Sequence, residues 1–372
     1  MKFNYQKSIY CCCLIVCLSL QLKAFSDNLP SNATTSYPST SNTIFKEFLG
    51  DDPKIITLKT TLDSLVTNKN SNKFYPATVQ YEDANGITIQ QNIEVKVRGR
   101  SRRRYCDFPP LKLKFSAKEL EAHGLRKSHK SLKLVTHCNE IADANAYVIK
   151  EYLAYKMYNL LTNNSLKVQL VRVLYQDINN TDSFERFGIL IEDIDELAER
   201  IEGEEVEDFG LNNTHFDSKQ YNTFALFQFM IGNEDWRIPF KRNIKLIRPT
   251  NGSPLVVVPY DFDAAGIVST SYAKPDKDYK LQTVKQRVFM GSFRDKAERL
   301  EIVKLFQAKK TVVYNLINEC KYLADSDKQE VINYLDTFYD ILNDSTFLKK
   351  ALPLKGRTPR PTNEQGVFTS DM

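Results

Sequence analysis

A predicted β-hairpin in the second half of the chain constrains its fold more than any other segment. The Asn-Gly pair at residues 251–252 separates the apolar runs IKLI and PLVVVPY, and this arrangement is a strong short-range signal for a hairpin. Asp261 and Asp263 follow the second run, and Asp235 and Asn243 precede the first. Because a hairpin returns the chain to its start, we expect these four side chains to meet. Their oxygen atoms suit a hard cation such as Mg²⁺.

Length and composition indicate an ordinary globular chain. The 372 residues are 42% hydrophobic and 26% charged, with a net charge of +5, which is enough for one large domain or two lobes. So small a basic excess argues against a nucleic-acid-binding protein. The run RGRSRRR at 98–104 is nevertheless a local basic cluster, and phosphate groups are its expected ligands.

The first 26 residues fit a secretory signal peptide. Lys2 and Lys7 precede an apolar run, IYCCCLIVCLSLQL, and a small-residue site at Ala24-Phe25-Ser26 follows it. We therefore expect a secreted, periplasmic or cell-surface protein. No later segment approaches the roughly 20 apolar residues of a transmembrane helix, so no span is expected in the mature chain. A lipoprotein anchor at Cys17 is the alternative, but the preceding Leu-Ile-Val lacks the small residues of such sites.

The remaining cysteines predict at most one disulfide. Four of the seven cysteines lie in the signal segment, which leaves Cys106, Cys138 and Cys320. Cys106 and Cys138 are the expected pair by position, and no Cys or His spacing indicates a zinc site.

Periodicity divides the rest of the chain into a strand-rich and a helix-rich part. Residues 27–43 are rich in Ser, Thr, Asn and Pro and predict a disordered spacer, and 353–372 predict a flexible tail. Strand-like alternation occurs in ATVQYED, ITIQQNIEVKVRG, LKLKFS, VQLVRVLYQ and FGILIED. Helices are expected at 142–161, 194–207, 219–231, 296–320 and 326–344. We therefore expect a sheet-rich part over 44–192 and a mainly helical part over 193–352.

Glu151 is an acidic residue on the apolar face of the first of these helices. Its neighbours at the i±3 and i±4 positions are Tyr147, Val148, Ala154 and Tyr155. A carboxylate in such surroundings needs a cation. Phosphoryl transfer in kinases uses a set of groups in a fixed order along the chain. The order is a cation on a strand, a Glu on a helix, and then an Asp, an Asn and a metal-binding Asp. The present chain has candidates for these groups in the same order, with the last Asp across the hairpin.

At this point the chain resembles a known family. The blocks RGRSRRRYCDFPPLKLKF, KEYLAYKMYNLL, FGILIED, GNEDW, RNIKLI and VPYDFD resemble, in this order, those of CotH-type (spore coat protein H) kinase-like proteins. The resemblance covers about residues 90–270. It implies an α+β, atypical protein-kinase-like fold of two lobes, with an N-terminal antiparallel sheet lobe and a mainly helical C-terminal lobe. It also implies transfer of the γ-phosphoryl group of ATP to Ser or Thr of a protein, with Mg²⁺ or Mn²⁺.

Carried over position by position, the resemblance implies a role for each matching residue. Asp235 is the catalytic carboxylate, Glu151 pairs with the nucleotide lysine, and Asp261, Asp263 and Asn243 hold the metal. Arg98, Arg100, Glu192 and either Lys112 or Lys114 contact the nucleotide, the two lysines being alternatives because they lie on one face of a strand. The family's frequent His-Asn is Arg242-Asn243 here, and no GxGxxG loop precedes the lysine.

Other interpretations of the same residues stay open. The chain could be a catalytically inactive surface or coat-assembly protein that binds a phosphorylated or acidic partner, or a metal-dependent phosphoesterase. The basic cluster is alternatively a solvated turn or a nucleic-acid patch. Asp261 and Asp263 are alternatively turn-capping residues, and Glu151 is alternatively a core carboxylate with a structural partner.

Overall fold

The computed structural model describes residues 42–83, 85–354 and 361–367. The expected signal peptide and residues 27–41 of the expected spacer lie outside the described residues. So do residues 355–360 and 368–372 of the expected tail. The described residues all belong to one compact unit.

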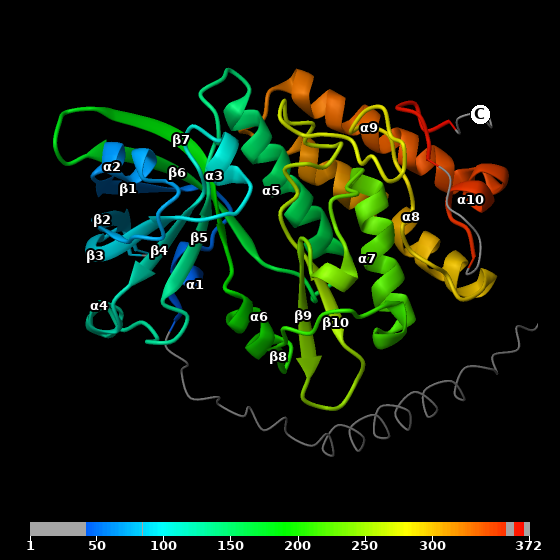
Figure 1. The fold of residues 1–372 in the computed structure, drawn as a ribbon, viewed down its shortest axis with the longest axis horizontal. Helices are drawn as coiled ribbons and strands as arrows, with labels where there is room; N and C mark the ends of the chain where they lie inside the picture. Colours follow the sequence, from blue (N-terminus) through cyan, green and yellow to red (C-terminus); the bar gives the residue numbers. More distant parts are fainter. Residues whose placement is uncertain (1–41, 84, 355–360, 368–372) are drawn as a thin grey trace, which may run out of the picture. The chain divides into compact units, whose positions relative to one another are not determined.

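Seven strands of this unit close into a barrel in the order β1-β2-β3-β4-β5-β7-β6 (Figure 1). Strand β1 is antiparallel to β2 on one side and parallel to β6 on the other, which closes the ring. Alternate side chains of each strand fill the interior, among them Leu58, Val95 and Leu113. The strands are β1 (Lys54–Thr60), β2 (Tyr75–Glu82), β3 (Thr88–Val97), β4 (Leu111–Phe115), β5 (Ser131–Val135), β6 (Val168–Asp177) and β7 (Ser183–Ile191).

The predicted two-lobed, protein-kinase-like fold is wrong. Its N-terminal antiparallel sheet is instead a closed barrel with one parallel pair. Its helical C-terminal lobe instead contains a three-stranded sheet, in the order β10-β9-β8, of β8 (Gly203–Glu205), β9 (Ile244–Pro249) and β10 (Val256–Pro259). The prediction failed because β1 and β6 are more than 100 residues apart, and no local pattern records a pairing over that separation.

Helices surround both sheets. Helix α5 (Ala144–Leu161) connects β5 with β6 and packs against β6, β7 and α8 (Figure 1). The other helices are α1 (Ile44–Phe48), α2 (Leu62–Thr67), α3 (Arg102–Tyr105), α4 (Ala117–Ala122), α6 (Ile194–Arg200), α7 (Ser218–Ile231), α8 (Lys296–Asn318), α9 (Asp325–Asn343) and α10 (Ser345–Ala351). Short 3₁₀ turns lie at Asn213–His215 and Ile238–Phe240. Among the described residues, no helix is long and apolar enough to cross a membrane.

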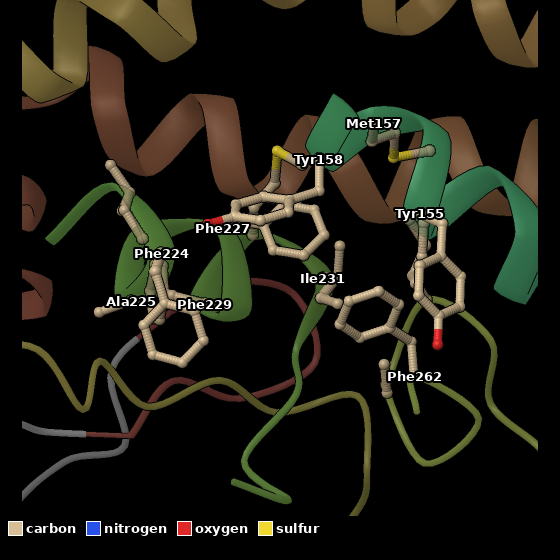
Figure 2. Packing of buried hydrophobic residues seen from close by; sticks show 14 of the residues in the cluster. Tyr155, Met157, Tyr158, Phe224, Ala225, Phe227, Phe229, Ile231 and Phe262 are labelled. Atoms are coloured by element: carbon tan, nitrogen blue, oxygen red, sulfur yellow. The ribbon is translucent and has the colours of Figure 1, made fainter. Parts of the chain in front are cut away.

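An aromatic cluster joins α5, α7 and the segment after β10 (Figure 2). The ring centroids of Tyr155 and Phe262 lie 4.5 Å apart, those of Tyr158 and Phe227 4.5 Å, and those of Phe227 and Phe262 5.5 Å. Phe262 is fully buried. This anchor fixes the short segment in which Asp261 and Asp263 stand on either side of Phe262.

Two smaller features complete the fold. The predicted disulfide between Cys106 and Cys138 is confirmed, and Cys320 is free. Within the expected tail, Thr362 is fully buried and its backbone N–H donates to the carbonyl oxygen of Arg287 at 2.8 Å. The described part of the tail therefore packs on the body of the protein.

Candidate functional site

The predicted hairpin is confirmed, and it returns the chain to its start. Strands β9 and β10 are antiparallel, with Ile244 opposite Pro259. Gly252 in the connecting loop has φ +76°, in the left-handed region that favours glycine. Beyond the last pair, the N–H of Tyr260 donates to the carbonyl oxygen of Asn243 at 3.1 Å. Asp261 therefore emerges directly beside Asn243, as the sequence predicts.

Asp235 is held by the two residues that precede β9. The Nδ2 atom of Asn243 donates to the Oδ2 atom of Asp235 at 2.9 Å and to its carbonyl oxygen at 2.7 Å. Arg242 forms an ion pair with the Oδ1 atom. Burial raises the pKa of Asp235 to about 6, against the lowering effect of Arg242 and with a further rise from Asp261 and Asp263. The side chain is 30% exposed, so this carboxylate is both perturbed and accessible.

Arg102 lies at the centre of the other three carboxylates. Its Nη2 atom lies 2.6 Å from Oδ1 of Asp261 and 3.3 Å from Oε2 of Glu151, and its Nε atom lies 2.9 Å from Oδ2 of Asp263. The side chains of Arg102 and Glu151 are 6% and 3% exposed, whereas that of Asp261 is 38% exposed. Burial raises the pKa values of Glu151 and Asp263, although Arg102 opposes both shifts. We call Arg102, Glu151, Asp261 and Asp263 the carboxylate cluster.

The cation that pairs with Glu151 differs from the expected one. Lys112 and Lys114 were the candidates, but Arg102 of α3 occupies this position. The Nζ atom of Lys114 instead lies 2.7 Å from Oε2 of Glu94 on the outer surface of the barrel. Lys112 faces lysines on both neighbouring strands. The sequence did carry a signal for Arg102, because it stands inside RGRSRRR, where only Arg98 and Arg100 were selected.

Lys133 is a second residue that sequence reasoning missed. It lies on β5 between the buried residues Leu132 and Leu134, in the same alternating pattern as Lys112. Desolvation lowers the pKa of Lys133 to about 8, with further lowering by Arg98 and against the opposing effects of Asp193 and Glu205. Desolvation also lowers the pKa of Arg98, against the opposing effect of Asp261. Among the described residues, no carboxylate lies within ion-pair distance of either cation.

Among the described residues, no contact joins the other two predicted contact residues, Arg100 and Glu192, to this group. Arg100 is exposed. Glu192 is buried, and its oxygens accept from Arg200 at 2.9 Å and from the N–H of Lys167 at 2.9 Å. Both oxygens of Glu192 are thus engaged in holding β7 to α6, and the expected role of Glu192 at the nucleotide finds no support in these contacts.

The predicted metal ligands differ in how far their oxygen atoms are already engaged. Asp261 directs one carboxylate oxygen to Arg102, whereas the Asp263 carboxylate contacts Arg102 and also accepts a hydrogen bond from Tyr272. Asn243 uses its Nδ2 atom on Asp235, which leaves its Oδ1 atom for another partner. In the described part of the chain, no three His, Cys, Asp or Glu side chains stand in a ready-made metal group. Carboxylate and amide oxygens are the donor set that Mg²⁺ and Mn²⁺ take, so these residues fit such a cation by their chemistry.

No protein-family model matches the chain, and no curated protein matches it. The resemblance to CotH-type proteins therefore stays a prediction that depends on the quoted blocks alone.

Proposed function

We propose that the chain is a phosphotransferase that moves the γ-phosphoryl group of ATP to a Ser or Thr hydroxyl of a protein, with Mg²⁺ or Mn²⁺. The observation that supports this most is the position of Arg98 and Lys133. Both are largely desolvated cations that form no ion pair among the described residues. Asp193 and Glu205 offset the desolvation of Lys133 only in part, and Asp261 is close enough to Arg98 to affect its pKa. Desolvated cations of this kind need an anion, and phosphate is the anion that Arg and Lys bind most readily.

The roles of the residues follow from their surroundings. Arg98 and Lys133 hold the phosphates of the donor and stabilise the charge that develops on the transferred group. Asp235 accepts the proton of the acceptor hydroxyl, because a pKa of about 6 leaves it ionised at neutral pH yet basic enough to take a proton. The hydroxyl oxygen then bonds to the γ phosphorus as the bond to the leaving ADP oxygen breaks.

The metal site would be formed by Asp261 and Asp263, with the free Oδ1 atom of Asn243 nearby. A bound divalent cation neutralises charge on the donor phosphates. Arg102 holds Asp261 and Asp263 close together, since its Nη2 and Nε atoms contact one carboxylate each. Glu151 fixes Arg102 from the side of α5.

One observation favours the second candidate, a catalytically inactive binding protein. Arg102 already contacts all three acidic members of the carboxylate cluster, and a protein that keeps this arrangement permanently would bind anions through Arg98 and Lys133 without turning them over. Both proposals include a secreted or cell-surface location, a protein partner and no nucleic-acid partner. This partner is a Ser or Thr acceptor in the first proposal and a phosphorylated or acidic ligand in the second.

Thermal unfolding of the full chain with ATP and Mn²⁺ tests the nucleotide site. Ligand at a hundredfold excess over Kd adds about 2.7 kcal/mol to the free energy of unfolding, which raises the midpoint by a few degrees. The shift should require Mn²⁺ and disappear in Asp261→Ala. Asp51→Ala, which changes an exposed aspartate, should retain it.

Product analysis with labelled ATP separates the reactions. Labelled protein indicates transfer, and free phosphate without labelled protein indicates hydrolysis. Asp261→Ala should lower the transfer rate by at least about 100-fold, because electrostatic stabilisation supplies most of the catalysis of this reaction. A nucleotide-dependent shift without either product would favour the binding protein, and an unchanged rate in Asp261→Ala would refute the assignment.

A further inference from the structure

Three lysines form a row across neighbouring barrel strands. Lys96 of β3 is directly opposite Lys112 of β4, and Lys112 is directly opposite Lys133 of β5. Opposed residues of antiparallel strands project from the same face of a sheet. The burial pattern agrees, because each lysine is half-buried between two buried apolar neighbours along its strand. We call Lys96, Lys112 and Lys133 the lysine row.

Among the described residues, no lysine of the row forms an ion pair, although the charges of Asp193 and Glu205 partly offset the desolvation of Lys133. Like charges in directly opposed positions are unfavourable, and the same strands avoid this elsewhere, because Lys114 is opposite Glu94 and pairs with it. In the described part of the chain, the Nζ atom of Lys96 donates to Oδ1 of Asn72 at 2.9 Å and lies 4.7 Å from the ring centroid of Phe74, and it contacts no carboxylate. Desolvation and the charges of Lys112, Arg103 and Lys114 all lower the pKa of Lys96. This unfavourable grouping would be relieved by a bound polyanion.

The inner end of the row reaches the candidate site on the side of the phosphate donor. Arg98 directly follows β3, and its N–H donates to the carbonyl oxygen of Pro110 at 2.7 Å, which places Arg98 at the end of the sheet face that carries the row. The charge of Arg98 lowers the pKa of Lys133, and the charge of Asp261 raises that of Arg98. Strands lie 4.7–4.9 Å apart in a sheet, so the row extends about 10 Å outward from Lys133 to Lys96. An anion that fills it must carry negative charge along its whole length.

We propose that the lysine row binds an unbranched inorganic polyphosphate chain, with the terminal phosphate between Lys133 and Arg98 in the donor position. This inference depends on the proposed phosphotransferase function, because it identifies a donor class for the same site. A phosphate chain carries charge on every unit and matches a continuous line of cations. In a bound nucleotide, the uncharged base would lie beyond the phosphates and beside Lys96, so this lysine would have no negative partner. The hydroxyl-bearing segment of an acceptor protein should instead approach Asp235, which none of the lysines contacts.

Isothermal titration of the full chain with long-chain polyphosphate tests the inference, with ATP and Mn²⁺ titrated separately. Lys96→Gln should weaken polyphosphate binding by about tenfold, the effect of losing one charge-assisted contact, and change ATP binding by less than about twofold. Lys133→Gln should weaken both. Lys59→Gln, which removes an exposed lysine from β1 of the same barrel, should change neither. Polyphosphate should also displace ATP, because both need Lys133 and Arg98.

Three outcomes would overturn the inference. One is equal weakening of polyphosphate binding by Lys96→Gln and Lys59→Gln, which indicates non-specific attraction. Another is binding of polyglutamate of matched charge as tightly as polyphosphate, which indicates an acidic protein ligand. The third is polyphosphate that binds without displacing ATP. A failure of the proposed function can be told apart from a failure of this inference. If polyphosphate binds but ATP labels no protein, only the proposed ATP-dependent transfer is contradicted. Absent polyphosphate binding with intact labelling contradicts only this inference.

Discussion

The Nη2 atom of Arg102 lies 2.6 Å from Oδ1 of Asp261, inside a group that also contains Glu151 and Asp263. One guanidinium cannot neutralise three carboxylates, so the carboxylate cluster is short of positive charge. This shortage and the burial of Glu151 and Asp263 explain why their pKa values are raised. A divalent cation bound by Asp261 and Asp263 would supply the missing charge without entering the buried side occupied by Glu151.

Arg102→Met should lower the free energy of unfolding by about 3 kcal/mol at pH 7.5, because removing one partner leaves buried carboxylates without a cation. Without Arg102, the folded-state pKa values of Glu151 and Asp263 rise further above their unfolded values. Folding then takes up protons, so the variant loses stability as pH rises from about 4 and regains it as pH falls. Denaturant unfolding at pH 5 and pH 7.5 should show a smaller deficit at pH 5.

Arg172→Met is the matched control for this prediction. Arg172 pairs with Glu185 on the barrel surface, and the two side chains are 43% and 40% exposed. Such a pair contributes less than about 1 kcal/mol, so this variant should differ little from the parent at either pH. A deficit in Arg102→Met that is as small as the control's, or that is independent of pH, contradicts the account of the carboxylate cluster.

The local parts of this structure could be predicted from the sequence. The hairpin at 251–252 and the helices at 219–231, 296–320 and 326–344 follow from turn chemistry and apolar periodicity, and the structure places α7, α8 and α9 within two residues of those bounds. The meeting of Asp235, Asn243 and Asp261 also follows from local geometry, because a hairpin fixes which residues face each other.

The long-range parts could not be predicted in the same way. Closure of the barrel depends on β1 pairing with β6, and the alternating apolar residues of β1 bury one face whichever strand lies beside them. Arg102 and Lys133 reach the site from a four-residue helix and from a strand that was not predicted. Arg102 and Lys133 lie at the site in place of Lys112 because the rest of the barrel fixes the positions of α3 and β5.

The rate of phosphoryl transfer should fall at low pH with an apparent pKa of about 6, because Asp235 must be ionised to accept a proton. Arg242→Gln removes the cation that lowers the pKa of Asp235, so the decline should begin at a higher pH in this variant. Asp235→Asn should lose transfer at all pH values. Initial rates between pH 5 and pH 8 measure the shift, and a pH profile unchanged in Arg242→Gln would contradict the role of Asp235.

Nucleotide affinity should be nearly constant below pH 8 and fall above it. Desolvation lowers the pKa of Lys133 to about 8, and only the protonated amine attracts phosphate. Bound phosphate favours the ammonium form, so binding takes up protons in this range. Titration calorimetry at pH 7, 8 and 9 measures the trend. Lys133→Arg keeps its charge throughout and should show no such decline. A decline of equal size in Lys133→Arg would show that another group is responsible.

Removal of the disulfide should destabilise both the fold and the candidate site. Cys106 and Cys138 are separated by 32 residues, and opening a loop of this length costs about 3 to 4 kcal/mol in the chain-entropy account. Cys106 directly follows α3, which carries Arg102, so the Cys106→Ser/Cys138→Ser variant should also bind ATP with Mn²⁺ more weakly. Denaturant unfolding and nucleotide titration measure the two effects. Cys320→Ser, which removes the free cysteine, should change neither. Full nucleotide affinity in the double variant would show that α3 keeps Arg102 in place without the disulfide.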